Sequence, residues 1–184
     1  MKVYSAIKRA AVFLAVAALV CPSMVIVLAD TTSGSIAVTG GSLSLSPAAV
    51  TMSGVTLDGT DHNNVSGTTS AWTAEDPTGT GSGWHGTIVA SNFSDGSGHS
   101  IAKSGFDIQL LDENIVLNSG NTKPTSQVTS FTNFASEITF VSASAGTGMG
   151  NYSLTPTFRL DVPAETHAGS YSCTITTTIT SGPS

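Results

Sequence analysis

Cysteine is almost absent from this chain of 184 residues, which contains only Cys21 and Cys173. Cys21 lies in an N-terminal segment that we expect to be removed, so Cys173 has no partner within the mature chain. A small domain that depends on disulfides is therefore excluded. Export without disulfides is normal for a bacterium that has a single membrane.

Basic residues are also scarce, and half of them lie at the N-terminus. These three residues precede an apolar run over residues 10–20, and small or aliphatic residues follow up to Ala29. A basic head, an apolar run and small residues, in that order, predict a secretory signal peptide over residues 1–29, with cleavage after Ala29. A membrane anchor and a lipoprotein site at Cys21 are the alternatives that we considered.

Positive charge is nearly lost once residues 1–29 are removed. Three basic residues then face twelve acidic ones, which gives a formal net charge of −9. Such a surface repels nucleic acids and anionic lipids, so we expect no nucleic-acid partner and no membrane contact after cleavage. The remaining residues 30–184 are enough for one domain with its own core, and we expect no internal domain boundary.

A sustained helical period is missing from residues 30–184. Short runs that alternate apolar and polar residues recur instead, separated by clusters of Ser, Thr and Gly. This pattern predicts an all-β fold, either an antiparallel β-sandwich or a barrel-like single domain. A short helix within residues 103–111 or 130–136 is compatible with the pattern.

Two of the alternating runs lie close together near the start of the mature chain. Residues 35–39 and 42–46 alternate on either side of two glycines, which predicts a turn between two strands. The last run, residues 170–180, has apolar side chains on one face and Ser or Thr on the other. Thr177 is the exception, since its hydroxyl falls on the apolar face. One packed and one solvated face is typical of an antiparallel sheet.

Motifs for catalysis or metal binding are missing as well. The four histidines are isolated in the sequence, and no Cys-x-x-Cys spacing, nucleophile elbow or phosphate loop occurs. The adjacent acids Asp112 and Glu113 fit a solvated turn better than a glycosidase pair. Residues 58–64 are rich in oxygen ligands, but their spacing is not that of an EF-hand loop, which favours a polar turn over a calcium site. We therefore expect no enzymatic activity, no cofactor and no metal.

The two tryptophans of the chain lie in one stretch, at Trp72 and Trp84. The residues between them include Asp, Pro and Gly, which favour turns, so a hairpin could bring the two rings close. The rings then either pack in the core or leave one face exposed as a stacking surface. The sequence favours the core for Trp84 and leaves Trp72 open between the two interpretations.

These residues, with others later in the chain, resemble the WxL-domain surface proteins of Gram-positive bacteria. The first block comprises Trp72, Asp76 and Trp84 with a proline and three glycines at the spacing of the family. The second block comprises a Gly-rich segment that leads to a tyrosine over residues 145–152, followed by matches within residues 160–183.

The resemblance covers residues 34–183 in the right order. It departs from the family at the two Trp-x-Leu tripeptides, which read Trp-His-Gly from Trp84 and Thr-Thr-Ile from Thr177. It implies a secreted protein that is held non-covalently on the cell wall, through peptidoglycan or another wall glycan. It also implies complexes with other surface proteins.

Matched residue by residue, the resemblance assigns cell-wall binding to six positions: Trp72, Asp76, Trp84, Tyr171, Thr177 and Ile179. The net charge of −9 favours a neutral glycan or peptide stem over anionic wall polymers. A second hypothesis is an assembly or adhesion subunit that binds another surface protein. In that case residues 170–180 would be an edge strand that pairs with the partner.

Overall fold

The computed structural model of this chain describes residues 30–184. The predicted signal peptide and Cys21 lie outside the described residues. The chain divides into two units, residues 1–37 and residues 38–184. Every described strand belongs to the second unit, and the prediction of an all-β fold is confirmed.

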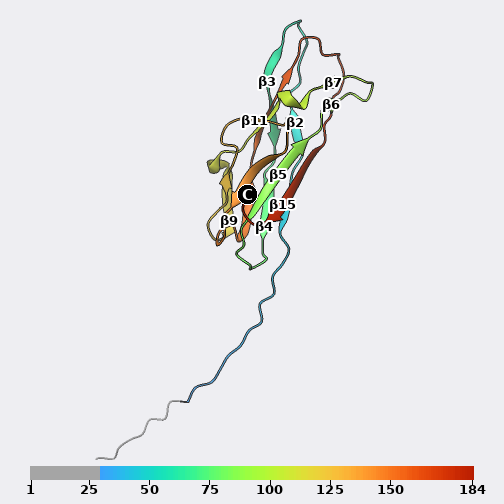
Figure 1. The fold of residues 1–184 in the computed structure, drawn as a ribbon. Coiled ribbons are helices and arrows are strands. Elements are labelled where there is room, and N and C mark those ends of the chain that lie inside the picture. The colour runs from blue at the N-terminus through green and yellow to red at the C-terminus, as the bar shows by residue number, and fades with distance from the viewer. Residues whose placement is uncertain (1–29) are drawn as a thin grey trace, which may run out of the picture. The chain divides into compact units, whose positions relative to one another are not determined.

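Strands and two single-turn 3-10 helices make up this unit (Figure 1). In chain order they are β1 (Ser44–Ser46), β2 (Val50–Met52), β3 (His62–Thr69), β4 (Trp72–Asp76), β5 (Trp84–Ala90), β6 (Phe93–Ser94), β7 (Ser100–Ile101), η1 (Lys103–Gly105), β8 (Phe106–Gln109), η2 (Asp112–Asn114), β9 (Ile115–Gly120), β10 (Thr125–Ser126), β11 (Thr132–Asn133), β12 (Ile138–Ala143), β13 (Gly150–Leu154), β14 (Thr157–Val162) and β15 (Ile175–Ser181).

Three antiparallel sheets form the body of the unit. Sheet A has the strand order β1-β4-β13-β9, sheet B has β11-β8-β14-β3-β2, and sheet C has β10-β12-β5-β15; β6 and β7 form a separate hairpin. In β4 and β5 every second residue is buried and the residues between are half-buried. A period of two is what a strand with one face on a core requires. Of the two architectures that the sequence allowed, the structure is the sandwich.

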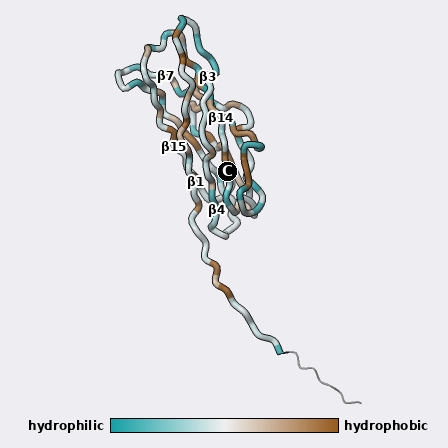
Figure 2. Tube along the Cα trace, turned by 180° about the vertical axis from the view of Figure 1, so that it is seen from behind, coloured by the Kyte–Doolittle hydropathy of each residue, from teal (hydrophilic) through white to brown (hydrophobic). Residues whose placement is uncertain are grey.

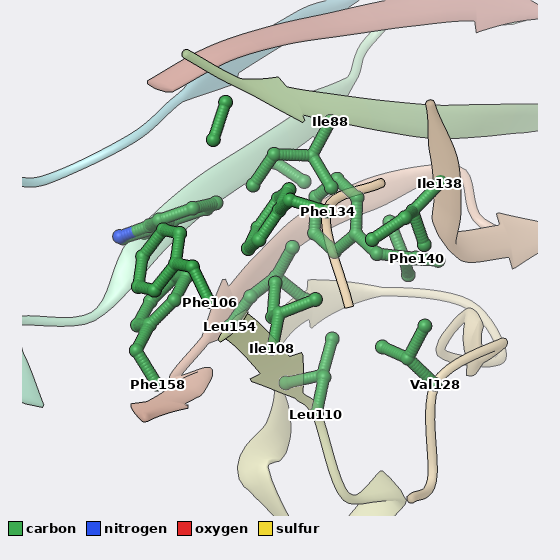
Figure 3. Close-up of a cluster of buried hydrophobic side chains, with 14 of the residues drawn as sticks. Ile88, Phe106, Ile108, Leu110, Val128, Phe134, Ile138, Phe140, Leu154 and Phe158 are labelled. Carbon is green, nitrogen blue, oxygen red and sulfur yellow. The ribbon is translucent and has the colours of Figure 1, made fainter. Parts of the chain in front are cut away.

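Aromatic side chains dominate the core between the sheets. Phe106 stacks with Phe134 and Phe158 at centroid distances of 4.8 and 5.6 Å. Trp72 contacts Phe140 edge-on at 5.9 Å and Phe158 at 6.0 Å. Figure 3 shows the phenylalanine rings of this cluster among aliphatic side chains that come from all three sheets. Burial of large rings supplies much of the hydrophobic stabilisation of so small a domain.

The strand pair predicted over residues 35–46 does not form. Residues 35–39 carry no strand, and only β1 pairs, with Leu45 opposite Ala74 of β4. Gly41 donates its N–H to the carbonyl oxygen of Pro77 at 2.9 Å. β1 pairs instead with β4, which already has one face buried in the core. The two glycines lie against the loop after β4 and do not close a hairpin.

Helical structure is limited to single turns within residues 30–184. Residues 103–111 contain η1 and then β8, and residues 130–136 contain β11 and a turn. No helix in the described part of the chain has the length and hydropathy to cross a membrane.

The alternation predicted for residues 170–180 is present. Its odd-numbered residues, from Tyr171 to Ile179, are half-buried, and the Ser and Thr residues between them are exposed. Thr177 does lie on the inner face. β15 pairs with β5 on one side only and is an edge strand of sheet C.

Candidate functional site

Trp84 begins β5 and is fully buried. Its indole Nε1 donates a hydrogen bond to the carbonyl oxygen of Gly148 at 2.8 Å, and its ring lies 6.3 Å from the ring of Tyr152. The backbone of Gly148 comes this close because it has no Cβ; a Cβ there would lie 2.7 Å from Nε1 of Trp84. The indole therefore fixes the loop between β12 and β13.

Trp72 begins β4 and is also buried, with 1% of its surface exposed. Its Nε1 donates to the hydroxyl oxygen of Thr69 at 3.0 Å. The hairpin predicted between the tryptophans is wrong, because β4 belongs to sheet A and β5 to sheet C. Both rings lie in the core, so neither offers a face to a ligand. Trp72 contacts Phe140 and Phe158, whereas Trp84 contacts Tyr152.

Asp76 ends β4 and is buried, with 3% of its surface exposed. Its carboxylate oxygen accepts hydrogen bonds from the N–H of Thr78 at 3.1 Å and from the Thr78 hydroxyl at 2.6 Å. Such a bond to the backbone two residues on starts a turn. Burial raises the pKa of the Tyr152 hydroxyl, and the negative charge of Asp76 raises it further. In this position Asp76 shapes the loop after β4.

Pairing of β4 with β13 brings the two sequence blocks of the family resemblance together. Asp76 lies opposite Gly150, and Ala74 lies opposite Tyr152. The end of β15 joins them, since Gly182 donates its N–H to the carbonyl oxygen of Gly83 at 2.8 Å. Some of the residues that carry the resemblance, namely Asp76, Gly83, Gly150 and Gly182, therefore link the ends of neighbouring strands.

The other predicted binding positions lie on a different strand. Tyr171, Thr177 and Ile179 are half-buried on the inner face of the last strand and of the segment before it. The hydroxyl of Tyr171 donates to the carbonyl oxygen of His167 at 2.9 Å. The structure does not bring these three residues to one surface with Trp72 and Trp84. Their role in cell-wall binding stays a prediction.

A row of polar side chains lies on the outer face of sheet A. Asn118 of β9 donates through Nδ2 to Oδ1 of Asn151 at 2.7 Å and to Oγ of Ser153 at 2.9 Å. Asn151 donates in turn to the carboxylate of Glu75 on β4. We call these four residues the polar row. Their mutual hydrogen bonds fix the direction of each amide before any ligand arrives.

Two aliphatic side chains of β9 are exposed, and one of them, Val116, lies opposite Ser153 of the polar row. Val116 is 52% exposed and Leu117 is 44% exposed. The register of β9 against β13 shifts between Asn151 and Tyr152, where two residues of β9 occupy the place of one. A bulge of this kind leaves one residue unpaired and bends the strand. Leu117 lies opposite the buried Tyr152, so it is not on the face of the polar row. The outer face of sheet A therefore combines amides, a carboxylate and the apolar side chain of Val116.

Sequence reasoning missed the polar row. Asn151 and Ser153 alternate in the sequence, as residues on one face of a strand must. That signal marks β13 as polar on one side. It does not say that β9 and β4 are the neighbours of β13, and the row exists only through that pairing.

Two adjoining hollows lie between residues 47–57 and residues 166–175. The first has a volume of about 630 Å³ and the second about 760 Å³, and Met52, Phe93 and Tyr171 line both. Their walls are predominantly apolar. We call the two hollows together the edge groove.

His167 lines the second hollow and stacks on the ring of His99. The rings of His99 and His167 are 3.8 Å apart, and Nδ1 of His99 lies 2.6 Å from a carboxylate oxygen of Asp95. The bond to His99 and the N–H of Ser97 hold the pKa of Asp95 down to about 2. Within residues 30–184, no three His, Cys, Asp or Glu side chains come close enough together to hold a metal ion.

Comparisons of the chain with protein-family models, with curated proteins and with solved structures found no match. The case for a function therefore rests on the residues themselves. Two surfaces stand out in the described part of the chain. One is the outer face of sheet A with the polar row, and the other is the edge groove beside β15.

Proposed function

We propose that this chain is a non-catalytic, secreted surface protein that associates non-covalently with the bacterial cell wall, with peptidoglycan as the ligand. The observation that carries the proposal is the polar row on sheet A, with Val116 beside it. The resemblance to WxL-domain proteins, on residues 72–84 and 145–183, supports the same class of function.

The chemistry of the polar row suits a glycan. An amide side chain both donates and accepts hydrogen bonds, as sugar hydroxyls and acetamido groups do. Asn118 uses its N–H₂ group within the row, which leaves its exposed carbonyl oxygen directed for a donor of the ligand. Val116, opposite Ser153, offers apolar contact for the faces and methyl groups of the sugars. A largely preformed surface of this kind loses little entropy on binding.

The net charge favours an uncharged wall polymer. After removal of residues 1–29 the chain carries a formal charge of −9, so anionic wall polymers are repelled. In this proposal Trp72, Asp76 and Trp84 support the site from inside, because they hold β4 and the loops at its end. This is a different role from the direct contact that the resemblance alone implies.

The test is binding of the exported chain to purified peptidoglycan sacculi, with and without their anionic polymers. We compare the wild type with Asn118→Ala and Asn151→Ala. Asn63→Ala is the matched control, since Asn63 is an exposed asparagine on β3 of sheet B. Retention of the wild type and of Asn63→Ala, with about tenfold weaker binding of the two row variants, supports the proposal.

Two results would contradict it. Wild-type protein that stays in solution excludes wall binding under those conditions. Equal binding of the wild type and the three variants would show that the polar row does not contact the wall. In either case circular dichroism must first show that each variant keeps its β spectrum.

The second candidate is an assembly or adhesion subunit that binds another surface protein. The observation that favours it is β15, an edge strand of seven residues without a charged residue or a proline. Natural proteins usually protect such an edge with charges, prolines or a covering segment.

A further inference from the structure

The pairing of β15 with β5 determines which residues of β15 have peptide groups directed to its free edge. Thr174 accepts a hydrogen bond from the N–H of Ser91, and Gly182 donates one to Gly83. Peptide groups alternate in direction along an antiparallel strand. The even-numbered residues therefore bond to β5, and Ile175, Thr177 and Ile179 direct their N–H and C=O groups to the free edge. These residues also turn their side chains to the inside.

The edge groove lies along the start of this strand. Its lining includes Cys173 and Ile175 from the start of β15 and the segment before it, and Val50 and Met52 from β2. Only β5 pairs with β15 among the described strands, although β1 lies near it (Figure 2). The groove is thus an opening between the edges of two sheets, where one more strand would cover apolar side chains.

The two chain segments that form most of the groove lie within residues 31–57 and 166–184, which contain no Asp, Glu, Lys or Arg. The groups at the groove that can carry a charge near neutral pH are His167 and the neighbouring Asp95. The mature chain as a whole has a formal charge of −9, so two copies repel each other over most of their surfaces. This edge is a place where two copies can meet without that repulsion.

Residues 35–39 have the pattern of a strand but no partner in the structure. Ile36 is 88% exposed and Val38 is 87% exposed, more than any other large apolar side chain described. Figure 2 shows a hydrophobic stretch in the otherwise pale segment before β1. Both side chains are β-branched and two residues apart, so an extended backbone turns them to the same side. Residues 31–43 are also uncharged.

We propose that residues 35–39 of one copy of this chain bind to the free edge of β15 of a second copy, with Ile36 and Val38 in the edge groove. Five residues of strand span about 17 Å, and the seven residues of β15 span about 23 Å, so the added strand fits within the edge. Backbone hydrogen bonds supply affinity and the two aliphatic side chains supply register. The donor segment and the acceptor edge are different surfaces, so the contact can repeat head to tail.

The first test is sedimentation velocity of the exported chain over a range of concentrations. The wild type should form larger species as its concentration rises. A double variant, Ile36→Asp with Val38→Asp, should weaken this association about a hundredfold or more, because two apolar contacts are lost. Ala37→Asp is the control for charge, since its side chain points to the opposite side, and it should weaken association less.

The second test uses Cys173, which lines the groove. In a Cys21→Ser background, Val38→Cys is oxidised with copper phenanthroline and examined on a non-reducing gel. A ladder of disulfide-linked oligomers is expected. The same protein with Cys173→Ser added should give no species larger than a dimer. A wild type that stays monomeric at every concentration overturns the proposal. So does a Val38→Cys protein that forms an internal disulfide only, because residues 35–39 would then cover the groove of their own chain.

This inference does not rest on wall binding. The double variant leaves the polar row unchanged, so it should bind sacculi whether or not it self-associates. If the double variant loses its oligomers but still binds sacculi, and Asn118→Ala forms oligomers but binds sacculi weakly, the two surfaces act separately.

Discussion

The indole N–H of Trp84 donates to the carbonyl oxygen of Gly148 at 2.8 Å, across 64 residues of sequence. This single bond joins the start of β5 to the Gly-rich loop before β13. Ala143 closes the same contact, since a Cβ on Gly148 would lie 2.3 Å from the Cβ of Ala143. A tryptophan and a glycine that look like separate motif residues are therefore two halves of one packing contact.

Substitution of Gly148 tests this contact. Gly148→Ala places a methyl group against Trp84 and Ala143 and also strains a backbone with φ of 74°. We expect a loss of about 2–5 kcal/mol in the free energy of unfolding, from strain and overpacking together. Gly146→Ala is the control, because Gly146 has φ of 80° but open space around its Cβ. It should lose only about 1–2 kcal/mol. Equal losses in urea titrations would contradict the packing argument.

The burial of both tryptophans predicts a simple spectroscopic result. Trp72 is 1% exposed and Trp84 is 0% exposed, and the chain has no other tryptophan. The native emission should therefore be blue-shifted and poorly quenched by acrylamide, and unfolding in urea should shift it to the red. Free tryptophan amide, measured alongside, gives the fully exposed limit. Strong quenching of the native protein would mean that at least one ring has a solvent face.

Local alternation predicted the all-β class, because it records which side of each strand is buried, although the strand predicted over residues 35–39 does not form. The inner face of residues 170–180, including Thr177, could be identified in this way. Partners could not. The loop after Asp76 suggested a hairpin, but β4 pairs with β1 and β13, and β5 pairs with β12 and β15. Turn residues fix where a strand ends and leave open which sheet the next strand joins.

The candidate sites depend on the same long-range pairing. The polar row exists because Asn118 and Asn151, 33 residues apart, meet across a shifted register. The exposure of Ile36 and Val38 is also a tertiary result, since their sequence alone predicts a paired strand. Two residues on which the resemblance rests, Asp76 and Gly150, lie opposite each other in sheet A, and the resemblance itself did not predict this pairing. It did not show that the tryptophans are buried.

The Asp95–His99 pair predicts an acid-dependent contribution to stability. The pKa of Asp95 is lowered from 3.8 to about 2, first by the hydrogen bond with His99 and then by the N–H of Ser97. The folded value lies below the unfolded one, so the stabilisation is present above about pH 4 and is lost as the pH falls towards 2. Asp95→Asn should be less stable than the wild type at pH 5 and should approach it near pH 2.

Urea midpoints at several pH values measure this difference. Glu113→Gln is the control, because Glu113 is an exposed acid in the turn of η2. Its difference from the wild type should change little over the same interval. A deficit of Asp95→Asn that is as large at pH 2 as at pH 5 would show that the ionised carboxylate is not the stabilising form.

We expect Arg159 on β14 to stabilise the fold through both the charge and the planar shape of its guanidinium group. Its Nε donates to a carboxylate oxygen of Asp107 on β8 at 2.6 Å, and its guanidinium carbon lies 4.1 Å from the ring centroid of Phe131. Arg159→Lys keeps the charge but loses the planar group that stacks and donates at once, so we expect a loss of about 1 kcal/mol. A double-mutant cycle with Phe131→Leu isolates the stacking, with a coupling of about 0.5–1 kcal/mol. The side chain of Asp107 is only 14% exposed, so the effect of Arg159→Lys should persist in moderate salt.

Additive single effects in the cycle would mean that Phe131 only covers the ion pair and does not bind the cation.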